Sequence, residues 1–298
     1  MHPPQRPRLL VTAAAAVAAM LLPAAADAAQ LIARNPTQIR LQVSRHGQAL
    51  VSYRSYGRQH HTLAWGAINA RLPGPDVRQV AFNVDYSGGW RSFRRSARQF
   101  RGTCGAYDGP PLRWKVAACK AADGTYWALQ LWQRALPNYG AAAPPHRRVY
   151  ELWLSHWRGP LPVLEVNVGW ALGRYHTLFG RATYLGKPLY GFGTTRLGAP
   201  TDKHGRLVYV DTWGSAYGSG WRRENSFVTH RQSGAFCYGF WPHGDRPSGV
   251  GKRYRATLMA PGVLPDVYWE GVAPSVYDAA FDATQKQKLR DLNDRLCG

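Results

Sequence analysis

Short runs in which apolar and polar residues alternate recur along most of the chain. Residues 38–44 and 48–55 alternate on either side of His46-Gly47, which predicts a β-hairpin. Gly186-Lys187 separates two later runs and predicts another tight turn. Turn residues punctuate the runs throughout, so we expect an all-β protein, an antiparallel β-sandwich or a jelly-roll-like stack. The other expected strands are 61–68, 79–85, 126–133, 149–156, 163–170, 178–185, 188–194, 207–212, 226–230, 235–240, 253–259 and 267–270.

Residues 90–101 have helical rather than strand periodicity and predict a short basic helix. One face is apolar and the other is rich in arginine, so the segment suits an anionic surface or phosphate groups. The alternative is a surface helix whose aromatic residues belong to the core and whose arginines are solvated or paired. The arginines of the basic face are Arg91, Arg94, Arg95 and Arg98.

Residues 284–296 predict a second helix, at the C-terminus. Leu289, Leu292 and Leu296 recur at helical spacing and would form its apolar stripe. The segment runs up to Cys297, so an amphipathic helix should pack against the sheets just before the chain ends.

The start of the chain has the three parts of a secretory signal peptide. Two arginines precede an apolar run, 9–26, and residues 26–28 (Ala-Asp-Ala) offer small side chains at the positions that a signal peptidase reads. We expect residues 1–28 to be removed and 29–298 to form a single β-rich domain that is secreted or associated with the cell envelope. No later run is long enough to span a bilayer, so no transmembrane segment is expected in the mature chain.

The four cysteines are an even number in a chain that we expect to be exported, which predicts two disulfides. Three pairings are possible. We favour Cys104–Cys119, because the turn-rich sequence between them closes a short loop, and Cys237–Cys297, because this bridge would hold the C-terminus. Neither Cys-x-x-Cys nor a Cys–His spacing occurs, so we expect no metal site and no cofactor.

Basic residues outnumber acidic ones by 38 to 17, a formal net charge of +21. GC-rich codon usage explains the preference for Arg over Lys but not the scarcity of carboxylates. A positive field of this size attracts polyanions over a Debye length of about 8 Å. The expected partner is a cell-wall glycan or another acidic polymer rather than nucleic acid, although compositional bias alone is an equally open explanation.

Three expected strands, 126–133, 149–156 and 163–170, carry the residue types of a sugar-binding cleft on one face. Side chains two apart in a strand share a face, and a short turn would place the last two strands side by side. Indole rings stack on sugar rings, whereas amides and acids bind hydroxyl groups. The residues expected on this face are Gln130, Trp132, Glu151, Trp153, Glu165 and Asn167.

Glu151 and Glu165 would lie near each other on that face. Two carboxyl groups about 5–9 Å apart can hydrolyse a glycosidic bond, one as acid and the other as base or nucleophile. The alternative is a structural face whose tryptophans are covered by another layer.

Residues 219–231 form a second polar cluster. With Asp211 they could supply an acid–base set through Glu224 and His230, or form an ion-pair network through Arg223. The chain has no zinc-protease motif, no nucleophile elbow and no phosphate-cradling loop.

These patterns favour an exported, non-enzymatic module that binds polysaccharide or another anionic polymer. One alternative is a secreted carbohydrate-active hydrolase that uses Glu151 and Glu165. The other is a structural envelope protein without a small ligand, so the sequence leaves open whether the protein is an enzyme.

Overall fold

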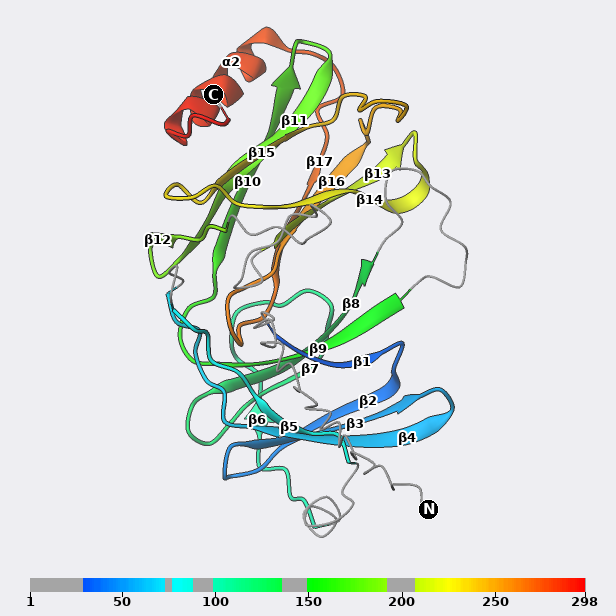
Figure 1. Ribbon diagram of the computed structural model, residues 1–298, viewed down its shortest axis with the longest axis vertical. Coiled ribbons are helices and arrows are strands. Elements are labelled where there is room, and N and C mark those ends of the chain that lie inside the picture. The colour runs from blue at the N-terminus through cyan, green and yellow to red at the C-terminus, as the bar shows by residue number, and fades with distance from the viewer. Residues whose placement is uncertain (1–28, 73–76, 88–98, 136–148, 192–206, 298) are drawn as a thin grey trace, which may run out of the picture.

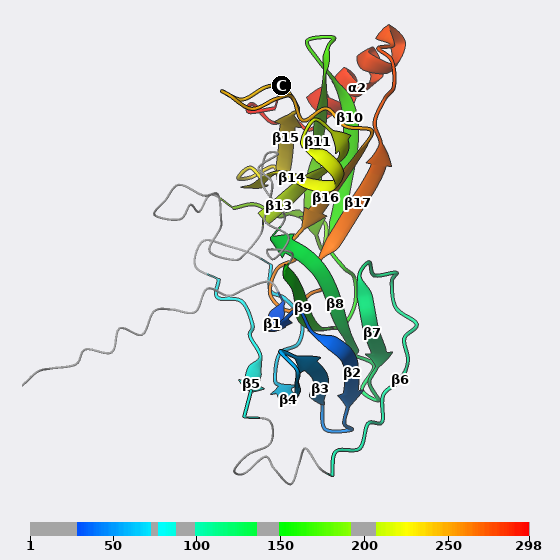
Figure 2. The same cartoon turned by 90° about the vertical axis from the view of Figure 1, so that its right-hand side faces the viewer.

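The protein is mostly β, with antiparallel sheets and a single described helix near the C-terminus, as the alternation predicts (Figure 1). The computed structural model describes residues 29–72, 77–87, 99–135, 149–191 and 207–297. The strands of the described part form four sheets, which pack in two pairs along the long axis of the molecule (Figure 2).

The first pair of sheets forms the N-terminal half, which we call the N-terminal sandwich. Its core holds buried aliphatic side chains from both sheets, such as Val51, Leu129 and Leu154, together with Trp127. One sheet has the order β1 (Gln30–Arg34), β9 (Val149–Trp157), β8 (Tyr126–Ala135), β7 (Lys115–Lys120) and β6 (Gly105–Ala106). The other has the order β2 (Thr37–Val43), β3 (Gln48–Ser55), β4 (Arg58–Trp65) and β5 (Asn83–Asp85).

The second pair forms the C-terminal sandwich. Its core packs Leu178 and Phe236 from one sheet against Val210 and Tyr254 from the other. One sheet has the order β14 (Gly218–Val228), β13 (Leu207–Ser215), β16 (Arg253–Leu258) and β17 (Val267–Val272). The other has β10 (Val163–Ala171), β11 (Tyr175–Tyr184) and β12 (Lys187–Pro188), with β15 (Ala235–Gly239) paired to β11. The helix α2 (Ala279–Asp291) lies beside β10.

The two sandwiches are in contact through the sheet that contains β8 and β9. Ala128 and Trp157 of that sheet belong to the same apolar cluster as the C-terminal core. Gln130 Nε2 also donates to the backbone carbonyl of Asp266, and the backbone N–H of Asp266 donates to Gln130 Oε1. The expected single domain stays a prediction, but these contacts show how the two halves are joined.

The hairpin of β2 and β3 confirms the turn predicted at His46-Gly47. The turn between β11 and β12 lies one residue earlier than expected, at Leu185 and Gly186, whose φ angles are 50° and 71°. Two positive φ angles are what a two-residue hairpin turn of the mirror-image type requires. Alternation does not reveal β1, β6 and β7.

The C-terminal helix is confirmed, but its expected bounds of 284–296 are wrong. Asp278 starts the helix earlier, because its side chain accepts a hydrogen bond from the backbone N–H of Phe281. Asn293, at φ 49°, takes the left-handed conformation that commonly ends a helix. Leu292 is therefore a buried cap residue, whereas Leu296 is 67% exposed and is not part of an apolar stripe.

The expected basic helix at 90–101 falls almost wholly on residues 88–98, outside the described part of the chain, and with it Arg91, Arg94, Arg95 and Arg98. Both expected disulfides are present, Cys104–Cys119 and Cys237–Cys297. Within the described ranges, no helix has the length and apolar character that crossing a membrane requires.

Candidate functional site

Four of the six residues expected on the sugar-binding face come together, but they are buried. Gln130 lies opposite Trp153, and Trp132 lies opposite Glu151, in the register of β8 and β9. Gln130, Trp132 and Trp153 are 0%, 1% and 3% exposed. Trp132 Nε1 donates to Asp266 Oδ2 at 3.1 Å, from the C-terminal sandwich. The second sandwich covers this face, so the prediction that these side chains contact a glycan gains no support.

Glu165 and Asn167 do not join that face. The strand β10 pairs with β11 and not with β9, so Glu151 and Glu165 belong to different sheets. The segment between β9 and β10 contains Pro160 and Pro162, which cannot donate ladder hydrogen bonds, and it carries the chain from one sheet to another. The expected pairing of the two carboxyl groups is therefore wrong. Glu165 is exposed, and Asn167 accepts a hydrogen bond from Lys288 of α2.

Glu151 is held in an ion-pair network. Its two carboxylate oxygens lie 3.2 Å from Arg34 Nε and 3.6 Å from Arg134 Nε. Arg134 also pairs with Asp266 at 2.9 Å, and its guanidinium group lies 3.7 Å from the ring centroid of Trp153. Burial raises the pKa of Asp266, although the charge of Arg134 acts to lower it. This network neutralises charge at the junction between the sandwiches, and both of its carboxylates, Glu151 and Asp266, are buried.

The second polar cluster divides into two buried groups. Asp211 accepts hydrogen bonds from Arg223 and Arg255 and is fully buried, so the ion-pair interpretation is confirmed for these residues. Glu224 is also fully buried, and its Oε1 accepts hydrogen bonds from the hydroxyl groups of Tyr217 and Tyr238 at 3.1 and 3.0 Å. Burial raises the pKa of Glu224 to about 7, although both tyrosines and Arg246 act to lower it.

A surface depression of about 770 Å³ lies at the other end of that cluster, around His230. Strand β11, the turn before β12, the loop before β15 and the segment after α2 all contribute to its wall. Its charged side chains are unequal in number: three arginines and one carboxylate. These are Arg181, Arg231, Arg295 and Asp294.

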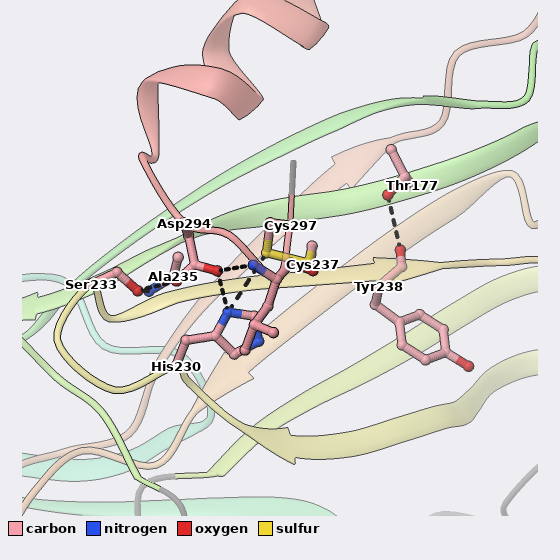
Figure 3. Close-up of a disulfide and its surroundings, with 9 residues drawn as sticks. Thr177, His230, Ser233, Ala235, Cys237, Tyr238, Asp294 and Cys297 are labelled. Carbon is pink, nitrogen blue, oxygen red and sulfur yellow. Dashed lines mark hydrogen bonds and ion pairs between the residues drawn. A yellow bond between two sulfur atoms is a disulfide. The ribbon is translucent and has the colours of Figure 1, made fainter.

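The single carboxylate of the depression is fully engaged by neutral or weakly basic partners (Figure 3). Asp294 Oδ1 lies 2.8 Å from His230 Nδ1, and its Oδ2 accepts a hydrogen bond from Ser233. Partial burial acts to raise the pKa of Asp294, but the hydrogen bonds from Ser233 and His230 hold it below its usual value. Among the residues that the structure describes, no carboxylate forms an ion pair with any of the three arginines.

Arg181 contributes a buried donor to this wall. One terminal nitrogen of its guanidinium group donates to the carbonyl of Leu292 at 2.6 Å. Its Nε is buried and has no hydrogen-bond partner. A buried donor without an acceptor costs about 1–3 kcal/mol.

The fold brings these groups together through tight backbone contacts. Gly234 has φ 68°, and a Cβ atom there would lie 2.6 Å from the carbonyl oxygen of Ala182. The loop that carries His230 and Ser233 can therefore pack directly on β11. On the other side, the Cys237–Cys297 disulfide fixes the segment after α2 against β15.

Sequence reasoning misses most of this depression. His230 and Arg231 lie in the segment 219–231, but Arg181 and Arg295 are isolated residues in sequence. The one available signal is the predicted Cys237–Cys297 disulfide, which implies that the end of the chain lies beside the 230s.

Comparison with known proteins gives no further constraint, because no family model, no curated protein and no solved structure matches this chain.

Proposed function

We propose that the protein is exported and binds the anionic groups of an acidic polymer, such as a cell-wall polysaccharide, in the depression around Arg181. The observation that carries the proposal is the unpaired excess of arginine in this wall, with the buried Nε of Arg181 lacking an acceptor. Guanidinium groups bind carboxylate and phosphate oxygens with two parallel hydrogen bonds, so the donor set suits either anion.

The charge of the whole chain supports the same partner. A net charge of +21 raises the local concentration of polyanions and speeds their encounter with the surface. The signal-like segment at residues 1–28 and the two disulfides support export. We do not propose a hydrolase that uses Glu151 and Glu165, because these groups lie in different sheets and Glu151 is already ion-paired.

Binding to immobilised polygalacturonate, to a polyphosphate and to neutral dextran tests the proposal. We expect both anionic polymers to bind, with an affinity that falls as salt rises, and dextran not to bind. Arg181→Gln should weaken binding about tenfold, the loss of about 1.4 kcal/mol of charge-assisted hydrogen bonding.

Arg58→Gln is the matched control, because Arg58 is an exposed arginine on β4 of the N-terminal sandwich. Arg58→Gln removes one positive charge, as Arg181→Gln does. Equal effects of the two substitutions would show that only the overall field attracts the polymer. No binding to either polyanion would favour a structural envelope protein.

A further inference from the structure

Two sulfur atoms and an imidazole nitrogen converge beside the depression. The Sγ atoms of Cys237 and Cys297 and the Nδ1 atom of His230 all lie within 4.8 Å of one another (Figure 3). They come from β15, the C-terminal segment and the loop before β15, which the fold alone brings together. Among the residues that the structure describes, His230, Cys237 and Cys297 form the one cluster of potential ligands that could hold a metal ion.

The spacing suits tetrahedral coordination. Zinc binds thiolate sulfur at about 2.3 Å and histidine nitrogen at about 2.0 Å, so adjacent ligands of a tetrahedral site lie roughly 3.5 Å apart. His230 Nδ1 lies 3.8 Å from Cys297 Sγ. The Cα atoms of the two cysteines are 5.6 Å apart, which lets both sulfur atoms reach one ion without a rearrangement of the backbone.

We infer that reduction of the Cys237–Cys297 disulfide creates a binding site for a thiophilic divalent cation such as Zn²⁺, with Cys237, Cys297 and His230 as ligands. The oxidised bond occupies both sulfur atoms, so the site exists only after reduction. The inference does not depend on the proposed binding of acidic polymers, because it uses the two sulfur atoms and not the arginines.

The chemistry requires a dithiol reductant. The dithiol gives two electrons and two protons, the S–S bond breaks, two cysteine thiols form, and the reductant leaves as a cyclic disulfide. The cation then binds both sulfur atoms as thiolates, and their two protons pass to solvent. In the oxidised protein His230 donates from Nδ1 to Asp294, so its proton has to move to Nε2 before the lone pair of Nδ1 can bind the cation.

Asp294 lies beside the three ligand groups but is not one of them. Its Oδ1 lies 2.8 Å from the same nitrogen of His230, so a cation bound at this nitrogen replaces that contact. Ser233 holds the other carboxylate oxygen, which fixes the orientation of the group. His230 is 19% exposed in its side chain, and the two cysteines are half-buried, so the site is within reach of a small reductant and of the cation.

Titration with Co²⁺ tests this inference, because cobalt bound by thiolates in a tetrahedral site absorbs visible light. We expect the oxidised protein to show no such absorption, and the reduced protein to bind one equivalent. Zn²⁺ should then displace the cobalt. Circular dichroism of the same samples reports whether the β-sheets persist after reduction.

Two variants locate the ligands. His230→Ala keeps both thiols and should weaken Co²⁺ binding at least about tenfold. A Cys104→Ser, Cys119→Ser variant is the matched control, since it removes the other disulfide and should bind Co²⁺ as the reduced parent protein does.

Three results would overturn the inference. The first is the absence of thiolate absorption in a reduced protein that remains folded. The second is unchanged affinity in His230→Ala, or loss of binding in the Cys104→Ser, Cys119→Ser control. The third is loss of the β-sheet signal on reduction, because the ligands converge only in the folded C-terminal sandwich.

Discussion

Each sandwich has one disulfide, but one bridge joins neighbouring segments and the other joins segments that are distant in sequence. In the N-terminal sandwich, Cys104 and Cys119 are 15 residues apart and join neighbouring segments at the edge of one sheet. In the C-terminal sandwich, Cys237 and Cys297 are 60 residues apart and join β15 to the segment that follows α2. The second bridge ends beside the depression, where it holds the C-terminal segment with Asp294 and Arg295 near β15.

One buried titratable group in each sandwich gives opposite responses to pH. In the N-terminal sandwich, His156 is buried with its ring stacked on Trp127, the ring centroids being 3.7 Å apart. In the C-terminal sandwich, the carboxyl of Glu224 is buried. Burial disfavours the charged form of both groups, so His156 makes stability sensitive to acid and Glu224 makes it sensitive to base.

The largest expected effect tests the junction between the halves. Trp132→Ala removes a fully buried ring that stacks on Trp114 at 5.1 Å and donates to Asp266. We expect the free energy of unfolding to fall by roughly 3–5 kcal/mol, the usual loss for a large aromatic residue in a core. Urea denaturation measures this change. A loss below about 1 kcal/mol would show that the two sandwiches are energetically independent at this point.

Removal of each disulfide compares the halves directly. Closing a loop of 60 residues restricts the unfolded chain more than closing one of 15, by the entropy of loop closure. We expect Cys237→Ser, Cys297→Ser to lower the free energy of unfolding by about 4 kcal/mol and Cys104→Ser, Cys119→Ser by about 3 kcal/mol. Thermal melts of the two double variants check the order, and the reverse order would mean that native contacts, not chain entropy, determine the cost.

Glu224 should make the C-terminal sandwich less stable as pH rises. Its pKa is raised from 4.5 to about 7, so the folded state holds this proton more tightly than the unfolded chain does. The stabilisation is complete below the ordinary pKa and is lost as pH rises toward 7, on the order of 3 kcal/mol in all. The urea midpoint of the parent protein should fall as pH rises across this range. In Glu224→Gln, which keeps the shape of the side chain, this fall should be absent. An unchanged profile in the variant would exclude Glu224 as its source.

His156 should act in the opposite direction in the N-terminal sandwich. Burial lowers its pKa from 6.5 to about 4, although the Ala67 backbone and Asp123 act to raise it. The folded state therefore loses stability as pH falls from 6.5 toward 4, because only the unfolded chain takes up the proton readily. The effect is also on the order of 3 kcal/mol, but it overlaps the titration of surface carboxylates. Between pH 6.5 and 4, the His156→Gln variant should lose less stability than the parent protein. An equally steep loss in the variant would contradict the role of His156.

Local patterns determine much of this fold because strand periodicity and turn chemistry are local properties. The alternation in 149–156 identifies β9 and correctly places Glu151 and Trp153 on one face. The same pattern cannot say what covers that face. The sequence around Trp132 and Trp153 is the same whether these rings contact a sugar or a second sandwich. Only the packing of Asp266 and Tyr209 against Trp132 shows that the second sandwich covers them.

Strand order is likewise a tertiary property. The strands β9 and β10 are close together along the chain, yet β10 lies in another sheet, which separates Glu151 from Glu165. The segment between the two strands contains two prolines, which cannot continue a ladder of hydrogen bonds.

The sequence by itself determined the all-β class, most strands and the C-terminal helix, because each follows from spacing within a short segment. It narrowed the disulfides to three possible pairings, and the structure has the one that we favoured. Only the tertiary structure decided which polar residues meet. Arg181, Arg231 and Arg295 follow one another at separations of 50 and 64 residues and carry no common pattern. Their shared surface therefore exists only once β11, the loop before β15 and the C-terminal segment have packed together.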